Sequence, residues 1–510
     1  MAAPAHAPLT PFDSTGVERG PDGVKRYTDL QRSVVAMLRE SVERAPDDEA
    51  LVELGGRRLT YAELWDGALR VAGGLHALGI APGDRTAVHL PNGADWVLAW
   101  FGSVLAGALP VAVNTRFAPG EVAYVVEDSG ARHVFSAGEA LPDGQAPELP
   151  SPEPGDVVSL MYTSGTTGSP KGAMLTHENL LANVENARRC IGIAAEDEGP
   201  AHRALICVPL FHATGLHSQL LVALRLGGTA VIQAAFAGPE TLRALQEERI
   251  SSFVGVPAMY HYLVHMDGFE SAAVAGVRNA AYGGAPITPT LVHQLEAAWP
   301  NARLGNGFGQ TESTSISTFL PHEHAAERAE TVGLAAPVID VCVGEPGAAV
   351  GEGELLLRGQ TVCAGYWGKG EATAQTFVDG WLHTGDIGSI DEQGFVTLLD
   401  RTKDMVNRGG ENVYSVEVEN GLAGAPGVGE VAVLGVPDEM MGEKVGAVVV
   451  PLAEAELEPD AVIAHAREQL ADFKVPQYLR VREEPLPRNA AGKVLKAQLR
   501  DEVEWGAPLR

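Results

Sequence analysis

The segment YTSGTTGSPKG at residues 162–172 follows directly on the apolar run VVSLMY at residues 157–162. The apolar run predicts a buried strand, and the glycine- and hydroxyl-rich segment predicts a loop at its carboxyl end. Such a loop presents backbone N–H groups and hydroxyl donors to phosphate oxygens, and Lys171 adds a positive charge. A P-loop is excluded, because it needs Gly before the lysine and Ser or Thr after it, whereas Pro170 and Gly172 stand there. The segment therefore predicts a phosphate-binding loop of another type.

The chain on both sides of this loop alternates between predicted strands and helices. A capping box at residues 60–63 begins a helix that runs into the seventies. The predicted strands lie at 86–90, 110–113, 204–208, 229–233 and 253–256, and predicted helices lie at 96–105 and 239–248. Alternation of this kind is typical of parallel sheets with helices on their faces, and it continues to about residue 340.

The pattern changes beyond residue 340. Short predicted strands at 354–358, 381–383 and 395–399 are separated by Gly and Asp turns, which indicates a small β-rich subdomain. Beyond residue 403 the predicted strands are 430–436, 444–451 and 478–482, and the predicted helices are 460–470 and 492–503. We therefore expect an α/β fold with a large N-terminal domain of doubly wound sheets plus the β-rich subdomain at 1–402. A small α+β C-terminal domain follows at 403–510.

Length and composition restrict the classes of protein that fit. A chain of 510 residues is too long for one compact core. Its formal net charge of -29 disfavours nucleic acid and anionic membrane surfaces as partners. Residues 1–20 lack the apolar core of a signal peptide, and no run of 18 apolar residues predicts a membrane span. The four cysteines, at 190, 207, 342 and 363, lack zinc-ligand spacing, so we expect reduced thiols in a cytoplasmic protein.

Four further segments extend the pattern. They are NGFGQTES at 306–313, WLHTGDIG at 381–388, DRTKDMVNRGGENV at 400–413 and PRNAAGKVLK at 487–496. Together with residues 162–172, and in this order, they resemble the motifs of the adenylate-forming superfamily over about residues 30–500. That superfamily contains acyl- and aryl-CoA synthetases, peptide-synthetase adenylation domains and luciferases. The resemblance implies an AMP-forming acid–thiol ligase, which joins a carboxylic acid to AMP with release of pyrophosphate and then passes the acyl group to coenzyme A.

The resemblance also implies which residues bind ATP and Mg²⁺. The implied nucleotide residues are Thr163, Ser164, Gly165, Thr166, Thr167, Gly168, Lys171, Gly284, Ala285, Pro286, Asn306, Gly307, Phe308, Gly309, Thr311, Asp386, Arg401 and Lys493. Phe308 would lie beside adenine, Thr311 would contact the α-phosphate, and Asp386 and Arg401 would bind the ribose. Asp386 suits that role because its two oxygens can accept from two hydroxyls. Glu312 would bind Mg²⁺, which offsets the charge on ATP and on the developing pyrophosphate.

The C-terminal motifs imply a moving domain. Lys403 stands at the hinge position, and Gly409 and Gly410 would line the tunnel for the pantetheine arm of coenzyme A, where a Cβ atom would narrow the passage. Lys493 resembles the catalytic lysine of the first half-reaction, whose ammonium group would offset charge at the α-phosphate. Lys496, three residues further on, is expected to be a solvated helix residue.

The acyl pocket is predicted from PLFHATGL at 209–216 and GGAP at 283–286, which resemble the family's aromatic gate and the strip beside adenine. The implied lining residues are His212, Thr214, Gly215, Tyr282, Gly283, Gly284, Gly307 and Gly309. His212 would lie near the acid and joins Lys493, Thr311 and Glu312 in the implied catalytic set. Because small side chains leave room for a ligand, the wall favours a medium or bulky acid over acetate.

Several alternatives stay open at this point. The acyl acceptor could be a carrier protein, or the chain could run one half-reaction beside a partner ligase. A nucleotide-binding scaffold without catalysis is disfavoured because Lys493, Glu312 and Asp386 are all present. Luciferase chemistry is not excluded by the motifs. The sequence does not separate fatty, aryl, dicarboxylic and polycyclic acids, and it leaves a homodimer open.

Overall fold

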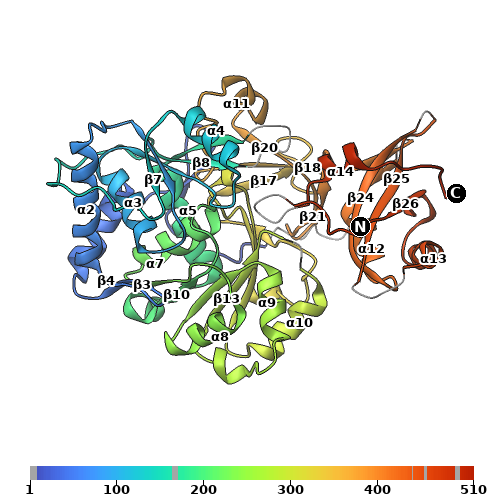
Figure 1. Cartoon of the computed structure of the whole chain (residues 1–510), viewed down its shortest axis with the longest axis horizontal. Coiled ribbons are helices and arrows are strands. Elements are labelled where there is room, and N and C mark those ends of the chain that lie inside the picture. The colour runs from blue at the N-terminus through green and yellow to red at the C-terminus, as the bar shows by residue number, and fades with distance from the viewer. Residues whose placement is uncertain are drawn as a thin grey trace, which may run out of the picture.

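The computed structural model describes residues 9–163, 170–285, 287–409, 411–438, 440–452, 457–488 and 494–509. A large part of the chain runs to the end of β21 (Val396–Arg401), and a smaller C-terminal part begins with β22 (Val406–Arg408) (Figure 1). The described residues form one nine-stranded sheet, three five-stranded sheets and a two-stranded hairpin. The predicted α/β fold class is confirmed. Among the described helices, none has the length and apolar composition needed to cross a bilayer.

The sheet that precedes the phosphate loop has the strand order β7-β5-β6-β8-β9. Its strands are β5 (Arg85–His89), β6 (Leu109–Ala112), β7 (Ala131–Ser136), β8 (Val157–Thr163) and β9 (Lys171–Thr176). The first four run parallel, and β9 returns antiparallel to β8, so that Thr163 pairs with Lys171. The predicted strand at 157–162 is therefore confirmed, and the loop begins where this strand ends. Residues 164–169, which include the predicted Ser164, Gly165, Thr166, Thr167 and Gly168, lie outside the described residues.

The nine-stranded sheet has the order β16-β15-β14-β13-β12-β10-β11-β3-β4. Its strands are β3 (Glu49–Glu53), β4 (Arg58–Thr60), β10 (Arg203–Ile206), β11 (Thr229–Ile232), β12 (Ser252–Gly255), β13 (Asn279–Gly283), β14 (Arg303–Phe308), β15 (Thr318–Leu320) and β16 (Leu334–Ala335). Strands β10 to β14 and β3 are parallel to one another. The carboxyl ends of these strands therefore meet at one edge of the sheet, which is where ligands bind in open α/β sheets.

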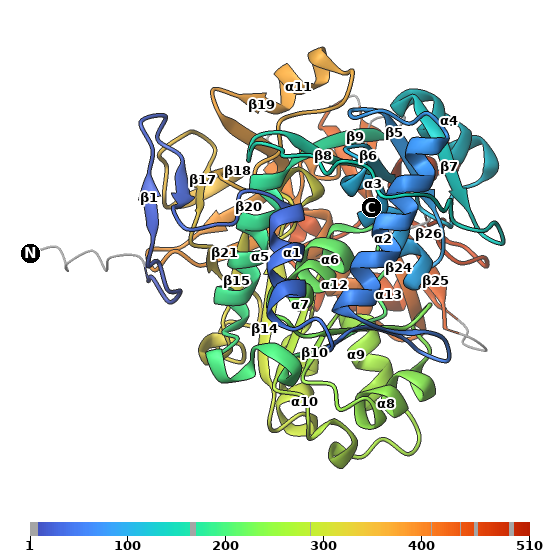
Figure 2. The ribbon, with the colours of Figure 1, turned by 90° about the vertical axis from the view of Figure 1, so that its left-hand side faces the viewer.

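Helices cover both faces of this sheet. One face packs into a core with α8 (Gly238–Glu247), α9 (Pro257–Val264) and α10 (Pro289–Ala298). The other faces a core shared with α1 (Val34–Arg44), α2 (Tyr61–Ala77), α3 (Ala94–Leu105), α5 (His177–Ile191), α6 (Ala213–Gly215) and α7 (Leu221–Arg225). Figure 2 shows α1 between α2 and α5 on the side turned away from the C-terminal part. The remaining helix of this region, α4 (Pro119–Ser129), packs near β7.

The predicted capping box at the start of α2 is confirmed. The Thr60 hydroxyl accepts from the Glu63 backbone N–H, and the Glu63 carboxylate accepts from that of Thr60. Near its other end, α2 contains Gly73 and Gly74. A Cβ atom at either position would lie 2.4 Å from backbone atoms of residues 143–145, so the connector that follows β7 packs directly against these glycines. The glycine pair, which is otherwise costly in a helix, is explained by this close approach.

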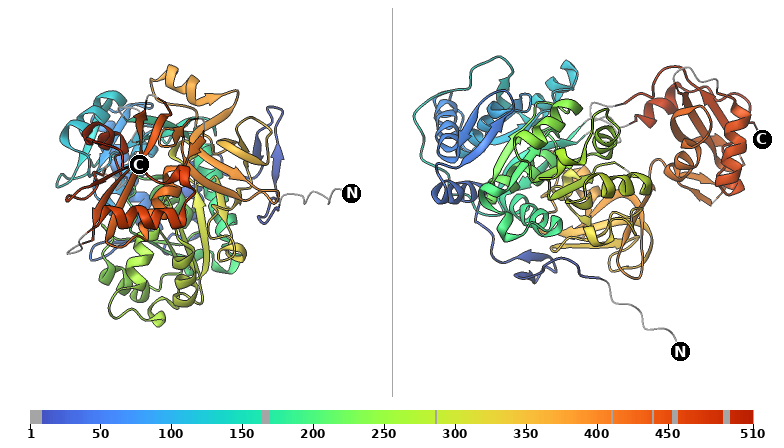
Figure 3. Two further views of the ribbon diagram at one scale, coloured as in Figure 1. Left: turned by 90° about the vertical axis from the view of Figure 1, so that its right-hand side faces the viewer. Right: turned by 90° about the horizontal axis from the view of Figure 1, so that it is seen from below.

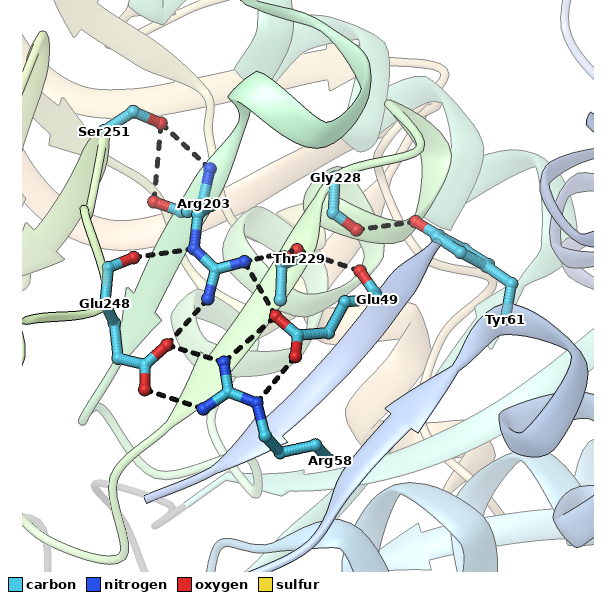
Figure 4. A network of polar contacts seen from close by, with 8 residues as sticks. All are labelled: Glu49, Arg58, Tyr61, Arg203, Gly228, Thr229, Glu248 and Ser251. Atoms are coloured by element: carbon cyan, nitrogen blue, oxygen red, sulfur yellow. Dashed lines mark hydrogen bonds and ion pairs between the residues drawn. The ribbon is translucent and has the colours of Figure 1, made fainter. Parts of the chain in front are cut away.

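A network of arginines and carboxylates fixes the β3–β4 edge of the large sheet (Figure 4). The buried guanidinium of Arg203, on β10, lies 2.8 Å from Glu49 Oε2 and 2.7 Å from Glu248 Oε2. Arg58, on β4, contacts the same two carboxylates at 2.6 Å and 2.8 Å. Thr229 Oγ1 donates to the backbone oxygen of Glu49. Because each buried charge has an opposite partner, the network locks β3 and β4 onto strands that come much later in the chain.

The β-rich subdomain is antiparallel and has longer strands than the sequence predicts. Its strands are β17 (Ile339–Val343), β18 (Gly351–Gly359), β19 (Phe377–Val378), β20 (Trp381–Ile390) and β21. A short helix, α11 (Gly370–Thr376), precedes β19. The N-terminal hairpin of β1 (Val17–Arg19) and β2 (Lys25–Tyr27) attaches to β17, because Arg19 and Lys25 both form ion pairs with Asp340.

The C-terminal part is a sheet with helices, as predicted, and lies beside the large part (Figure 3, right). Its remaining strands are β23 (Glu411–Val413), β24 (Val428–Asp438), β25 (Gly442–Pro451) and β26 (Tyr478–Val481), and its helices are α12 (Ser415–Ala423), α13 (Pro459–Gln469) and α14 (Lys496–Glu502). The expectation of a solvated Lys496 is wrong. Its Nζ lies 2.7 Å from Glu419 Oε1 and 2.6 Å from Ser415 Oγ, because Leu499 packs α14 into the core next to β24.

Candidate nucleotide and acyl site

Asp386 lies in a group that suits a ribose. The pairing of β20 with β21 places Asp386 opposite Arg401, whose Nε lies 2.8 Å from Asp386 Oδ1. Gln310 Nε2 donates to Asp386 Oδ2 at 2.5 Å and to the backbone oxygen of Thr384 at 2.9 Å. A carboxylate has about four acceptor sites, so these two contacts leave room for two hydroxyl donors. The structure thus brings the two predicted ribose residues together and adds Gln310, which stands inside the NGFGQTES motif but was not predicted.

Glu312 lies in a second group. The Tyr366 hydroxyl donates to Glu312 Oε1 at 2.7 Å, and Lys171 Nζ lies 5.2 Å from the centre of the Tyr366 ring. Burial and the Glu312 charge raise the pKa of Tyr366, so the phenol stays a donor. The contact connects Glu312 to Lys171, at the end of the predicted phosphate loop. Tyr366 lies outside the recognised motifs, and the sequence gives no signal for it.

The residues around Glu312 fit a magnesium ion held together with ATP. Among the described residues, no cluster of three or more His, Cys, Asp or Glu side chains could enclose a metal ion. Mg²⁺ is usually bound through one or two carboxylates together with the substrate phosphates and water. Glu312 has one oxygen occupied by Tyr366 and a second that can serve as such a ligand. One carboxylate is therefore sufficient for a site of this kind.

The strip predicted to lie beside adenine, residues 283–286, begins at the end of β13, which pairs with β14, the strand that ends at the predicted adenine residue Phe308. These strands place Gly283 opposite Gly307, and Phe308 packs half-buried at the edge of a core cluster with Val332. The Asn306 side chain is buried and donates to the backbone oxygen of Thr331 at 3.1 Å, so it supports the strand end. Gly284 and Ala285 are exposed, and Pro286 lies outside the described residues.

His212 and Thr214 lie at the start of a helix beside this edge. His212 is the N-cap of α6, and its ring lies edge-on to Phe211 with 4.7 Å between the centroids. A single π-helical segment, Leu216–Leu220, separates α6 from α7. Such segments are frequently found at functional sites. Both His212 and Thr214 are partly exposed, as expected for residues of an open site.

Two expectations about the acyl wall need correction. The Tyr282 side chain points away from α6 and packs against Tyr260 in the core with α9 and α10, so only its backbone can face a ligand near α6. Three glycines were predicted to leave room for the acid, but the structure gives another reason for their lack of a side chain. A Cβ atom would lie 2.4 Å from Pro209 O at Gly215, 2.3 Å from Gly307 O at Gly283 and 1.5 Å from Ser315 O at Gly309. They allow close backbone contacts and do not leave volume for a ligand.

Gly284 and Gly307 are less crowded. A Cβ atom at Gly284 would have Val256 as its first neighbour, at 4.0 Å, although the φ of +75° favours glycine there. At Gly307 the first neighbour would be Phe319, at 3.5 Å. Gly284 and Gly307 are therefore the predicted wall glycines at which a side chain would meet open space or ordinary contacts. The glycines of the wall give little support for a bulky acid.

The predicted hinge and tunnel residues lie at the start of the C-terminal part. The Lys403 backbone oxygen accepts from Arg500, which also pairs with Asp404. Desolvation lowers the pKa of Lys403; the Asp404 charge opposes this, and nearby cations such as Arg401 add to it. Gly409 has a φ of +65° and donates to Met441 O at 2.7 Å. Gly410 and the predicted catalytic Lys493 lie outside the described residues.

Comparison with known proteins gives the family. A profile described as "AMP-binding enzyme" matches residues 38–367, and one described as "AMP-binding enzyme C-terminal domain" matches residues 417–493. The chain belongs to the AMP-binding enzyme family. A feruloyl-CoA synthase from an Amycolatopsis species is 38% identical to this AMP-binding enzyme over 88% of the chain and 95% of the relative. The long-chain-fatty-acid–CoA ligase FadD13 of Mycobacterium tuberculosis is 33% identical over 92% and 99%.

A solved structure shows the same architecture. The o-succinylbenzoate CoA synthetase MenE of Bacillus subtilis, in complex with the acyl-adenylate OSB-AMP, superposes on this AMP-binding enzyme with a TM-score of 0.84. The two are 27% identical, and the match covers 94% of this chain and 99% of MenE. This AMP-binding enzyme is accordingly an AMP-forming acid–thiol ligase of the acyl-CoA synthetase type. The predicted family and enzyme class are confirmed.

Proposed function

We propose that this AMP-binding enzyme binds ATP with Mg²⁺ along residues 306–312 and Asp386, and converts a carboxylic acid to its coenzyme A thioester. The observation that supports this placement is the position of Gln310 and Glu312. Gln310 contacts the Asp386 group and Glu312 contacts the Tyr366–Lys171 group. Two residues therefore connect a sugar-binding end and a phosphate-binding end at one edge of the sheet, as one nucleotide requires.

In the first step a carboxylate oxygen attacks the α-phosphorus of ATP, the bond to pyrophosphate breaks, and an acyl-adenylate forms. Thr311 would donate to the α-phosphate, and Lys171 with the 164–168 loop would bind the other phosphates. Lys493 would offset the charge that accumulates at the reacting phosphorus. Glu312 would hold Mg²⁺, which supplies further charge compensation when bound. His212 would lie beside the carboxylate of the acid.

In the second step the coenzyme A thiol loses its proton, the sulfur attacks the carbonyl carbon, and AMP leaves. We propose that residues 403–510 act as a lid that turns about Lys403 between the two steps. The rotation would withdraw Lys493 from the site and bring in the tunnel surface that contains Gly409 and Gly410. The support is the short connection from β21 to β22 and the position of the C-terminal part beside the large part (Figure 1). Domain rotation would let one site perform two reactions.

Lys403→Pro is expected to slow thioester formation about 10-fold more than adenylation, because proline fixes φ at the residue that must rotate. Single-turnover measurements of pyrophosphate release and of thioester formation check this ratio. Glu392→Pro, in the turn between β20 and β21, is the control for a proline outside the hinge, because the Glu392 backbone N–H has no recorded acceptor among the described residues. Equal slowing of both half-reactions in Lys403→Pro would contradict the hinge assignment.

The substrate is proposed to be an aryl acid or a fatty acid, which are the acids named for the two relatives. Free coenzyme A is the proposed acceptor, with a carrier protein or partner ligase as alternatives, and assembly as a homodimer is a further proposal. We also place the enzyme in the cytoplasm, where ATP and coenzyme A are available. The four cysteines are buried and free, in keeping with a reducing compartment.

The function is tested by pyrophosphate release from ATP and Mg²⁺ with a panel of fatty, aryl, dicarboxylic and polycyclic acids. Acid-dependent release followed by thioester formation with coenzyme A is the expected result. A holo-carrier protein offered in place of coenzyme A separates the two acceptors. Release that does not depend on any acid, or an adenylate that neither acceptor consumes, would contradict the proposal.

A further inference from the structure

Thr314 has a backbone conformation that threonine rarely adopts. Its φ of +69° lies in the left-handed region, where a β-branched side chain is unfavourable. Such a residue persists only where its surroundings hold it in place. The other two described non-glycine residues with positive φ, Arg249 and Asp379, lie in exposed turns, whereas Thr314 is fully buried. The conformation of Thr314 is therefore imposed by its contacts inside the protein.

Three hydrogen bonds hold Thr314. Its backbone N–H donates to Thr311 O at 3.0 Å and closes the short 3₁₀ turn Thr311–Ser313. Its hydroxyl donates to Thr361 O at 2.5 Å. Its carbonyl oxygen lies 2.6 Å from His217 Nδ1, and because a carbonyl oxygen can only accept, Nδ1 carries the proton and donates. Each polar group of Thr314 is thereby bonded.

The contact with Thr314 explains why a histidine stands at position 217. His217 is fully buried in the π-helical segment Leu216–Leu220, and its Nε2 has no hydrogen-bond partner among the described residues. Burial lowers the pKa of His217 to about 4, although the bond to Thr314 acts in the opposite direction, so the ring is neutral at pH 7. An unpaired buried nitrogen is unfavourable, and phenylalanine would fill a similar space without one. The bond from Nδ1 is therefore what the imidazole contributes here.

The turn that ends at Thr314 contains the proposed ligands of the α-phosphate and Mg²⁺, Thr311 and Glu312. On one side of the turn, the Glu312 backbone oxygen accepts from the Cys363 N–H at 2.8 Å. On the other side, the contact comes from His217 in the segment between α6 and α7. Because the Thr314 N–H closes the turn onto Thr311, a change in the Thr314 backbone would rotate the peptide groups of the turn. The directions of the Thr311 hydroxyl and the Glu312 carboxylate therefore depend on the conformation of Thr314.

We propose that His217 is a positioning residue for adenylation: by donating to the Thr314 carbonyl oxygen, it holds the turn that directs the side chains of residues 311 and 312 toward ATP and Mg²⁺. Its role is indirect, because the ring is fully buried and its proton is given to Thr314. The inference rests on the proposed function and adds a residue to its first step. Pyrophosphate has left before the second step, so thioester formation should depend on His217 much less.

His217→Phe tests the proposal, because phenylalanine cannot donate to Thr314 O. Adenylation, measured as pyrophosphate release in a single turnover, is expected to slow by about 10-fold or more, since a strained residue loses one of its three bonds. Thioester formation from supplied acyl-adenylate is expected to slow by less than about 3-fold. His217→Asn should recover most of the loss, because the asparagine Nδ2 can donate from nearly the position of the imidazole Nδ1.

The conformation of Thr314 is tested by a second substitution and by a measurement that does not depend on catalysis. Glycine adopts positive φ without steric cost, so in a Thr314→Gly background the change His217→Phe should slow adenylation by less than about 3-fold. In the otherwise unchanged chain, hydrogen–deuterium exchange of peptides that span residues 308–318 should be faster in His217→Phe than in wild type, and close to wild type in His217→Asn.

His177→Phe is the matched control. It also removes a buried imidazole that bonds through Nδ1 to the backbone, but the partner is the Val34 N–H at the start of α1. Burial lowers the pKa of His177 to about 4 as well. This variant is expected to lower the stability of the protein and to leave the ratio of the two half-reactions unchanged. His217→Leu, which also lacks a donor, replaces His217→Phe if the larger side chain prevents folding.

The outcomes separate this inference from the proposed function. If the variant without a donor slows both half-reactions equally, or if His177→Phe changes their ratio as much, the inference is wrong and the ligase function stands. The same conclusion follows if His217→Asn recovers none of the loss, or if Thr314→Gly leaves the effect of His217→Phe undiminished. If no acid of the panel supports pyrophosphate release by the wild-type enzyme, the proposed function is wrong and the inference is wrong with it.

Discussion

Asp386→Ala is expected to lower kcat/KM for ATP by about 10²–10⁴-fold. Each hydrogen bond from a ribose hydroxyl to a carboxylate contributes about 1.5–3 kcal/mol, and the change removes both. It also leaves the Arg401 guanidinium and the Gln310 amide without the acceptor they share. Steady-state kinetics with varied ATP, at a saturating concentration of the best acid, measure the effect.

ATP analogues that lack one ribose hydroxyl test whether the loss comes from the contact between Asp386 and the sugar. In the wild-type enzyme, 2′-deoxy-ATP and 3′-deoxy-ATP should each be poorer than ATP, whereas in Asp386→Ala the three nucleotides should differ by less than about 3-fold, because coupled changes are not additive. Asp391→Asn, in the turn that follows β20, controls for loss of a paired carboxylate near this sheet. Full retention of the deoxy-ATP penalty in Asp386→Ala would refute the ribose assignment.

Lys496→Met is expected to destabilise the C-terminal part by about 2–3 kcal/mol, because it leaves the half-buried Glu419 carboxylate without its cation. Lys496 also donates to Ser415, whose hydroxyl and backbone N–H bind Asp400 at the end of the large part. The variant should therefore loosen the start of α12 as well. Hydrogen–deuterium exchange of peptides from α12 and α14 measures the local free energy of opening.

The effect should depend on pH in a defined direction. Desolvation raises the pKa of Glu419 above its ordinary value, so the protonated form favours the folded state and stability falls as pH rises through this pKa. Without Lys496 the pKa of Glu419 rises further. The difference in free energy of unfolding between wild type and Lys496→Met should therefore be small below pH ~4.5, where Glu419 is protonated, and reach its full value at pH ~7.5. Lys444→Met, which breaks the pair with Asp438 near the surface, should destabilise the C-terminal part much less. A Lys496→Met effect no larger than that, or one that shrinks as pH rises, would contradict the interpretation.

Local patterns predicted the features that depend on neighbouring residues. The capping box of α2 and the strand that ends at the phosphate loop are both confirmed, since each depends on residues a few positions apart. The pairing of Asp386 with Arg401 follows from two adjacent antiparallel strands, and the family resemblance of the motifs predicts that both residues bind the ribose. Features of this kind can be read from one sequence.

Contacts between distant segments were not predictable in the same way. Tyr366 meets Glu312 from 54 positions away, and Lys496 meets Ser415 from 81 positions away. Neither contact has a repeating pattern, because each arises only after the sheets pack. The small residues of the acyl wall were misinterpreted for a related reason: the backbone oxygens that crowd Gly215, Gly283 and Gly309 are set by tertiary packing.

The position of β3 in the nine-stranded sheet has a consequence for biosynthesis. Glu49, in β3, bonds to a residue 180 positions later, and Leu51 pairs with Ala230 of β11. At roughly 5–20 residues per second, a ribosome needs roughly 10–35 s to make the partner strand. During that interval the apolar segment Ala50–Val52 leaves the exit tunnel without its final neighbour. Nascent chains should therefore depend on holding chaperones, and slower translation should lower the yield of folded enzyme.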